Sequence, residues 1–307
     1  MASINEYLTS EVVVDYADGL ISRREALRRL SLLGLGAAVA GPLLAACETA
    51  GDQAGGGTPT PSTGSSGPSA PAGSAPAGPS PLAVQEITFV GPRGQLQGAW
   101  SAATEPRGAV LVIHENRGLT DHIRSVAGRL AASGFAALAI DLLSEEGGTA
   151  KFTDPAQATA ALNAAPPGRF VADMKAAVGE LQTRVPGKKT AAMGFCFGGG
   201  MVWQLLAAGE PRLRAAVPFY GPLPDNADLA GSKNAAVLGV YAELDTRVNA
   251  SRDAAKAALE KAGLKHEIVT YPGANHAFFN DTGPRYDPVA AAQVYQRLTD
   301  WFAANLT

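Results

Sequence analysis

Short apolar runs alternate with helix-like segments from about residue 85 to the end of the chain, and this alternation constrains the fold most. The runs Ala109–Ile113 and Phe135–Ile140 are almost continuously apolar, as expected of strands buried on both faces. Between them, apolar residues recur at spacings of three and four from Ile123 to Leu130, which predicts a helix with one buried face. Such an order of elements builds a mostly parallel sheet covered by helices on both faces, the α/β class.

The same patterns place the remaining elements. We expect strands at Thr190–Phe195, Ala215–Tyr220, Val237–Ala242 and Ile268–Tyr271, and helices at Met201–Ala208, Ser251–Ala262 and Pro288–Ala304. An antiparallel hairpin of Gln85–Val90 and Gln95–Trp100 should precede them. Ligand sites in sheets of this kind lie beyond the carboxyl ends of the strands.

A stretch poor in apolar residues divides the chain. Of the 31 residues from Gly51 to Pro81, 15 are Gly or Pro, and Asp52 is the one charged residue. Such a composition cannot bury enough apolar surface to offset the entropy cost of ordering. We therefore expect three parts: an N-terminal segment over residues 1–47, a disordered Pro/Gly/Ser-rich linker over 48–82, and an α/β domain over 83–307.

Charge and cysteine content exclude several classes of protein. From residue 82 onward, 21 Lys and Arg balance 21 Asp and Glu, and no basic stripe is present. The sequence therefore predicts no nucleic-acid partner. The two cysteines of the chain, Cys47 and Cys196, do not form a disulfide framework of the kind found in small secreted domains.

The N-terminal segment has the pattern of an export signal. The letters S-R-R-E-A-L-R-R at 22–29 precede an uncharged run over 30–46 that is shorter and less apolar than a membrane-spanning helix. Arg23-Arg24 resembles a twin-arginine signal, although Ala26 stands where a bulky apolar residue is usual. The run ends in L-A-A-C, which resembles a lipobox, so Cys47 is expected to become a lipidated N-terminus. The protein would then be periplasmic or cell-surface and attached to the membrane by this anchor.

Two alternatives for this segment remain open. One is an ordinary secretory signal in which Cys47 is incidental, and the other is an anchor that is retained. Residues 1–21 have no assigned role at this stage.

One strand end carries a candidate nucleophile. The letters G-F-C-F-G-G-G at 194–200 lie between an expected strand and an expected helix, and they have the G-x-nucleophile-x-G form of a nucleophile elbow. Gly194 and Gly198 would let the strand and the helix approach closely. Cys196 would then stand exposed at a helix N-terminus, where the amide dipoles favour a thiolate. The alternative interpretation is a small buried cysteine in a glycine-rich turn.

Two further strand ends offer a base and an acid. His276 follows the last expected strand, and an imidazole can take the thiol proton and return it to a leaving group. Asp245 follows the strand before, where a carboxylate would orient the imidazole. Both assignments have competitors in the sequence. His114 competes with His276, and Glu243 and Asp281 compete with Asp245.

These residues resemble a known family, the dienelactone hydrolases (carboxymethylenebutenolidases) of the α/β-hydrolase superfamily. The resemblance covers about residues 84–307 and rests on four motifs: H-E-N-R-G-L at 114–119, G-F-C-F-G-G at 194–199, L-D-T-R at 244–247 and N-H-A-F at 275–278. Its most specific element is cysteine where the superfamily usually has serine. The resemblance implies a Cys196–His276–Asp245 triad.

The resemblance implies further roles at the same site. Glu115 would face the thiol and help control its protonation, and the backbone N–H groups of Asn116 and Phe197 would form the oxyanion hole. Family members that act on dienelactone hold its carboxylate with arginines, one of them four residues after the histidine, where this chain has Asn280. Candidate substitutes that hold the substrate are Arg117, Arg247 and Arg285.

The expected function is hydrolysis of a small lactone or carboxylic ester through an acyl-thioester on Cys196, with no metal and no cofactor. A second hypothesis is a lipid-tethered binding protein that captures a small carbonyl ligand without turnover. A redox thiol is a third, but a resolving cysteine is missing nearby.

Overall fold

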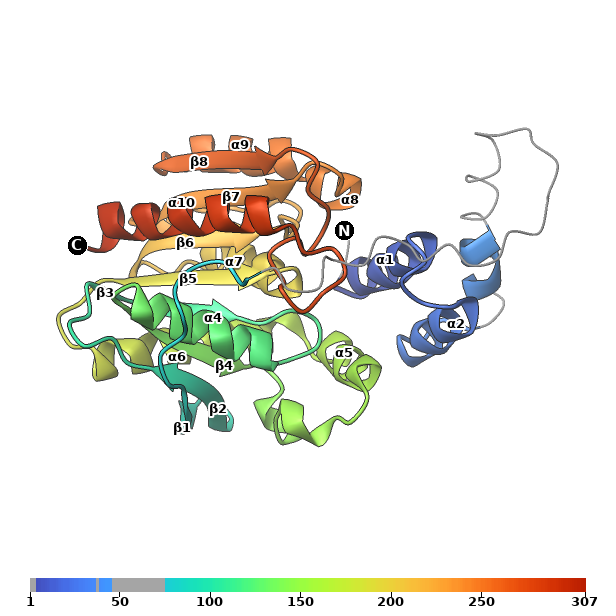
Figure 1. Ribbon diagram of the computed structural model, residues 1–307, viewed down its shortest axis with the longest axis horizontal. Helices are drawn as coiled ribbons and strands as arrows, with labels where there is room; N and C mark the ends of the chain where they lie inside the picture. Colours follow the sequence, from blue (N-terminus) through green and yellow to red (C-terminus); the bar gives the residue numbers. More distant parts are fainter. Residues whose placement is uncertain (1–3, 37–38, 46–74) are drawn as a thin grey trace.

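The computed structural model describes residues 4–36, 39–45 and 75–307 (Figure 1). Cys47 and most of the expected linker lie outside these residues. Within the described residues, no helix combines the length and the apolar character needed to cross a membrane.

The domain is built on one eight-stranded sheet. Its strands are β1 (Gln85–Gly91), β2 (Gly94–Ser101), β3 (Gly108–Ile113), β4 (Phe135–Asp141), β5 (Thr190–Phe195), β6 (Leu213–Phe219), β7 (Ala236–Ala242) and β8 (His266–Tyr271). They lie in the order β1-β2-β4-β3-β5-β6-β7-β8. The pairs β1–β2 and β2–β4 are antiparallel, and every later pair is parallel. The predicted α/β class and the N-terminal hairpin are confirmed.

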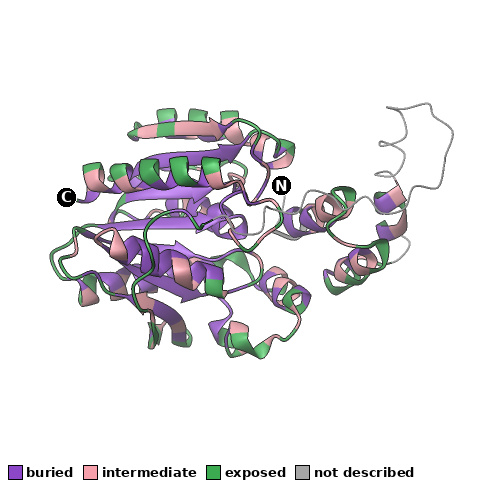
Figure 2. Ribbon diagram, viewed as in Figure 1, coloured by how far each residue is buried: buried purple, intermediate pink, exposed green. Residues whose placement is uncertain are grey.

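Helices cover both faces of this sheet (Figure 1). The helices of the domain are α4 (Asp121–Ala132), α5 (Pro155–Ala164), α6 (Pro167–Arg184), α7 (Phe197–Ala207), α8 (Thr246–Asn249), α9 (Arg252–Lys261) and α10 (Pro288–Leu306). Of these, α5 lies beyond the carboxyl ends of the strands. Helices α4 and α10 lie on one face, while α6 and α7 contact each other on the opposite face. The central strands β3 to β7 are almost entirely buried (Figure 2), which explains their continuously apolar sequences.

The sequence analysis did not predict helices α5 and α6, because it placed no element between residues 141 and 189. Helix α6 buries residues at helical spacing, among them Phe170, Met174, Val178 and Leu181, so its pattern was present in the sequence. The helix after Cys196 also begins at Phe197 rather than at Met201. Glycines at 198–200 have low helix propensity, and tertiary packing against neighbouring backbone overrides it.

The N-terminal segment contains the helices α1 (Ile4–Ala17) and α2 (Arg23–Leu32), and its residues 39–45 are also helical. Helices α1 and α2 lie beyond the carboxyl ends of the parallel strands, next to α5 (Figure 1). Helix α2 begins after Ser22, whose hydroxyl accepts a hydrogen bond from the Glu25 N–H. Arg28 of α2 forms an ion pair with Asp154 at the start of α5, at 2.6 Å.

The chain that leads from the undescribed residues into β1 contacts the domain. The Ala75 carbonyl accepts a hydrogen bond from the Tyr286 hydroxyl at 2.7 Å, and the Ala77 carbonyl accepts one from the buried Arg129 guanidinium at 2.8 Å. The Leu82 N–H donates to the Gly128 carbonyl. Residues 75–82, the end of the expected linker, are therefore held against α4 and the loop before α10.

Gly198 permits the contact on which the β5–α7 turn depends. A Cβ atom there would lie 2.4 Å from the Ile113 carbonyl oxygen and 2.5 Å from that of His114, so Gly198→Ala forces backbone apart. We expect this variant to lose about 2–3 kcal/mol of stability or to fail to fold, as measured by urea denaturation. Gly168→Ala, in open space at the exposed start of α6, is the control and should be neutral or stabilising by up to about 1 kcal/mol. Equal stabilities of the two variants would contradict this account.

Candidate active site

Cys196 stands at the tip of the turn between β5 and α7. Its backbone has φ 58° and ψ −118°, a conformation that an L-residue adopts only when its surroundings enforce it. Here its N–H donates to the Phe219 carbonyl of the neighbouring strand at 3.1 Å, and its carbonyl accepts from Gly200 in the first turn of α7. The geometry is that of the expected nucleophile elbow, and the side chain is 3% exposed.

His276 and Asp245 lie at the same edge of the sheet. Asp245 follows β7, and one of its carboxylate oxygens accepts from the Val248 N–H at the start of α8. The other oxygen lies 2.5 Å from Nδ1 of His276, in the loop after β8. Because Nδ1 is used in this way, Nε2 faces the sulfur, and the two atoms lie within 4.8 Å of each other.

The charge around His276 favours its protonated form. Burial by itself lowers the pKa of this imidazole, but the Asp245 carboxylate and Cys196 outweigh it and raise the pKa to about 9. In the arrangement seen here, His276 is therefore an imidazolium at neutral pH.

The competing residues have other partners. His114 uses both ring nitrogens: Nδ1 lies 2.7 Å from the Glu115 carbonyl of its own loop, and Nε2 lies 3.1 Å from the Leu142 nitrogen in the loop after β4. Glu243 accepts from the Gly273 N–H and so ties the β7 loop to the β8 loop. Asp281 lies 2.6 Å from Nδ1 of His122 and 3.4 Å from Arg129. These contacts are structural.

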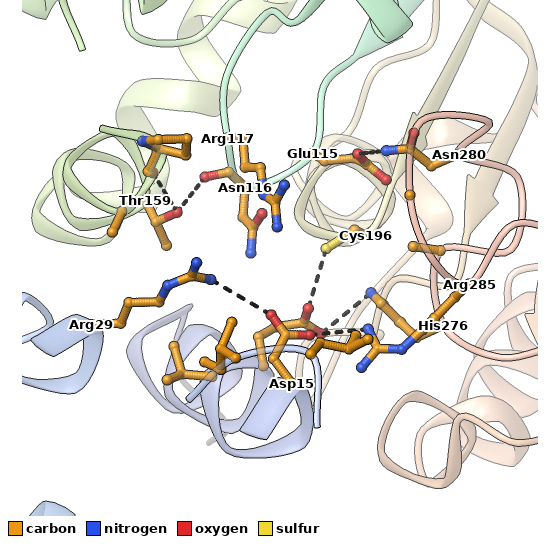
Figure 3. Close-up of a pocket in the computed structure, with 18 of the residues that line it drawn as sticks. Asp15, Arg29, Glu115, Asn116, Arg117, Thr159, Cys196, His276, Asn280 and Arg285 are labelled. Carbon is orange, nitrogen blue, oxygen red and sulfur yellow. Dashed lines mark hydrogen bonds and ion pairs between the residues drawn. The ribbon is translucent and has the colours of Figure 1, made fainter. Parts of the chain in front are cut away.

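The loop after β3 brings Glu115 and Asn116 to the site (Figure 3). Glu115 is buried, and its Oε2 accepts from the Asn280 side-chain amide at 2.6 Å, while its Oε1 has no hydrogen-bond partner among the described residues. The Asn116 carbonyl accepts from the Thr159 hydroxyl of α5. Phe197 is the first residue of α7, where backbone N–H groups have no intrahelical acceptor.

The three candidate substrate-binding arginines differ in their surroundings. Arg117 is exposed and lines the pocket beside the sulfur. Arg247 is partly buried and forms an ion pair with Glu11 of α1, and Arg285 forms ion pairs with Asp15 and Asp18 at 3.1 Å and 2.7 Å. Arg247 and Arg285 thus form ion pairs with acidic residues of the N-terminal segment, whereas the Arg117 side chain is exposed to solvent.

Helix α1 supplies two residues to the site that the sequence interpretation missed. The Tyr7 hydroxyl donates to the Cys196 sulfur at 3.3 Å, and the Glu11 carboxylate lies 3.3 Å from Nε2 of His276 and 3.9 Å from the sulfur. Burial and the nearby Cys196 raise the pKa of Tyr7 well above its ordinary value, so it remains a hydrogen-bond donor. No local motif marks these residues, because their role arises from where α1 packs.

A pocket of about 260 Å³ remains between α1 and the domain (Figure 3). Side chains of α1, α2, the β3 loop, α5 and the loop 276–285 line it. Glu11, Cys196 and His276 are the group of described residues whose ligand atoms are close enough to share a metal ion. In this arrangement Arg247 and the protonated His276 already balance the Glu11 charge.

Comparison with known proteins places this fold and site in a family. The model of the dienelactone hydrolase family matches residues 97–306. The chain belongs to this family. A "Putative carboxymethylenebutenolidase" of Salmonella typhi is 37% identical over 207 residues, which cover 63% of this chain and 76% of that protein. Another protein of that name, from Saccharolobus solfataricus, is 31% identical over 250 residues, which cover 70% of this chain and 96% of the relative.

A solved structure of a relative has the same fold. The crystal structure named "Putative Dienelactone Hydrolase" from Klebsiella pneumoniae superposes with a TM-score of 0.63 at 30% identity, and the match covers 72% of this chain and 98% of that one. Helices α1 and α2 precede residue 97, so they lie outside the residues that match the dienelactone hydrolase model.

The pair of His276 and Asp245 should make stability depend on pH. Because the folded-state pKa of His276, about 9, exceeds the ordinary 6.5, its contribution to stability is complete below pH 6.5 and disappears as the pH rises through about 9. We therefore expect the wild type to exceed His276→Gln in Tm most at pH 6 and least at pH 10. Thermal melts of both proteins across this range measure the difference, and a constant difference would contradict the assignment.

Proposed function

We propose that this member of the dienelactone hydrolase family hydrolyses a lactone or carboxylic ester, with Cys196 as nucleophile. The observation that carries the proposal is the elbow at Cys196, with the imidazole of His276 beside it and Asp245 bound to that imidazole at 2.5 Å. These three groups come from three different strand ends. They are the groups that acyl transfer to a thiol requires.

The reaction would proceed through two acyl transfers. His276 holds the thiol proton, and the Cys196 thiolate attacks the substrate carbonyl to form a tetrahedral oxyanion. This intermediate collapses to an acyl-thioester while His276 gives its proton to the leaving oxygen. The imidazole, now neutral, takes a proton from water, which attacks the thioester and releases the acid together with the Cys196 thiolate. Asp245 keeps the imidazole in the required tautomer throughout.

We assign the oxyanion hole to the backbone N–H groups of Asn116 and Phe197. Loss of one such donor costs roughly 3–4 kcal/mol of transition-state stabilisation in well-studied enzymes. Phe197 supports the proposal because the first N–H groups of a helix lack intrahelical acceptors. Glu115 is assigned to the control of the thiol charge, and its unpaired buried oxygen leaves it free to change partners.

An acidic substrate fits the charge of the site. Arg247 and Arg285 both bind carboxylates of α1 in this structure, so both recognise the group that a carboxylated lactone would present. Arg117 is exposed and lines the pocket, and it is the third candidate for binding the substrate carboxylate. Asn280 stands where dienelactone-hydrolysing relatives have an arginine, and it binds Glu115 instead.

The test is turnover of a panel of aryl esters and of cis- and trans-dienelactone by the wild type and by Cys196→Ala. We expect Cys196→Ala to lose at least a thousandfold in kcat/KM with an unchanged melting curve, because no other described residue can form the thioester. When the reaction of the wild type is quenched with acid, mass spectrometry should find the acyl group of the substrate on the peptide that contains Cys196. Gly168→Ala, at the exposed start of α6, is the control and should retain the activity of the wild type. Equal turnover by Cys196→Ala would contradict the proposal, and binding without turnover would favour the tethered binding protein.

We also propose that residues 1–46 direct export and that Cys47 becomes the lipidated N-terminus. Arg23 and Arg24 are both exposed at the start of α2, which leaves the arginine pair accessible to a receptor. Acylation of Cys47 would fix the enzyme to a membrane in the periplasm or at the cell surface.

Mass spectrometry of the protein from its membrane fraction tests this assignment. We expect a mature chain that begins at acylated Cys47. We also expect the double variant Arg23→Lys/Arg24→Lys to accumulate as the full-length precursor, because a twin-arginine receptor distinguishes arginine from lysine. Mature protein beginning elsewhere, or unchanged export of the double variant, would contradict it.

A further inference from the structure

Helix α1 occupies the position that a substrate carbonyl must reach. Attack requires a carbon within about 3–3.5 Å of the Cys196 sulfur. In the structure the Tyr7 hydroxyl lies 3.3 Å from this sulfur, and the Glu11 carboxylate lies 3.9 Å from it and 3.3 Å from Nε2 of His276. Both reacting atoms are therefore covered, and Cys196 and His276 are each only 3% exposed.

The contact between α1 and the domain is complementary in charge. Along α1, Glu11 pairs with Arg247, and Asp15 pairs with Arg285. Asp18, just after the helix, also pairs with Arg285. Arg247 makes further contacts: its guanidinium lies over the Tyr7 ring at 4.4 Å and donates to the Ser10 hydroxyl at 3.2 Å. Three acidic groups of one segment thus meet two arginines of the domain, of which Arg285 lines the pocket.

Apolar side chains of α1 are buried as well. Leu8 is fully buried and Val12 is 5% exposed, although both belong to a helix outside the family match. Helix α2 packs against α1 and is held to α5 by the Arg28–Asp154 pair. Arg29 of α2 also faces Asp15 across the pocket (Figure 3). Helix α1 is therefore held both by the burial of apolar side chains and by the ion pairs of its acidic residues.

We propose that the mouth of the active site is a docking site for an acidic helix, and that α1 is its intramolecular occupant and inhibitor. Glu11 imitates the carboxylate of a substrate: it binds Arg247 while it blocks the sulfur and the imidazole. The inference rests on the proposed function for its enzymatic consequence, while the docking itself is independent of it. Because α1 precedes Cys47, the proposed removal of residues 1–46 would take the inhibitor away, so that the precursor is inactive and the mature enzyme is open.

The accessibility of Cys196 tests the docking without reference to hydrolysis. In the full chain carrying Cys47→Ser, Cys196 is the single thiol, and its alkylation by iodoacetamide can be followed by mass spectrometry. Leu8→Asp places a charge at a fully buried position of α1 and should release the helix, since an unpaired buried charge is strongly unfavourable. We expect alkylation of this variant to be at least tenfold faster than that of the parent.

Two controls keep this result specific. Ala17→Asp introduces the same residue at an exposed position of α1 and should leave alkylation unchanged. A synthetic peptide of residues 4–20, added to the Leu8→Asp chain, should restore protection in proportion to its concentration, whereas the same peptide carrying Leu8→Asp should not.

Glu11→Gln provides a milder variant, which removes the ion pair with Arg247 and should raise the rate of Cys196 alkylation even if Leu8→Asp does not fold.

Ester hydrolysis by the same variants separates the two proposals. Parallel increases in alkylation and turnover support both of them. Faster alkylation without turnover in any variant supports the docking and contradicts the proposed hydrolysis. Alkylation of the parent chain as fast as that of Leu8→Asp and Glu11→Gln overturns the docking proposal, even if the chain hydrolyses esters.

Discussion

Close backbone packing around the β5–α7 turn holds the reactive sulfur, and the rest of the site is arranged about it. Gly194 and Gly198 pack so closely that a Cβ on Gly194 would lie 2.4 Å from the Gly198 carbonyl oxygen. A Cβ on Gly199 would lie 2.3 Å from the Phe219 carbonyl oxygen. This packing fixes Cys196 in a conformation that an isolated residue avoids. The strain places the sulfur at the helix N-terminus rather than within the sheet.

Electrostatics then determines what the sulfur can do. Asp245 uses one carboxylate oxygen to begin α8 and the other to hold His276, so the same side chain orders a loop and raises an imidazole pKa. Helix α1 enters this charged region with a carboxylate of its own. Glu11 satisfies Arg247 and faces the imidazolium at 3.3 Å, which explains how an acidic side chain can be almost completely buried there.

The proposed export signal and the helix over the active site belong to the same N-terminal segment. The segment with the arginine pair at Arg23-Arg24 and the segment over the active site are consecutive, and both precede Cys47. A receptor-read address for folded cargo requires a domain that folds before export. A helix docked over the thiol would cover a reactive group during that interval.

The sequence by itself determined the class of the fold, the strand positions and the three chemical groups at strand ends. It could do so because buried parallel strands are continuously apolar and an elbow requires glycines at fixed spacing. It favoured His276 over His114, and Asp245 over Glu243 and Asp281, without excluding the competitors, since each of these residues lies in a loop at or near a strand end. Only the tertiary structure separated them, through the hydrogen bonds that each residue makes with distant parts of the chain. The position of α1 was likewise decided by tertiary structure alone: Tyr7 and Glu11 are 189 and 185 residues from Cys196, and local sequence carries no information about contacts over that separation.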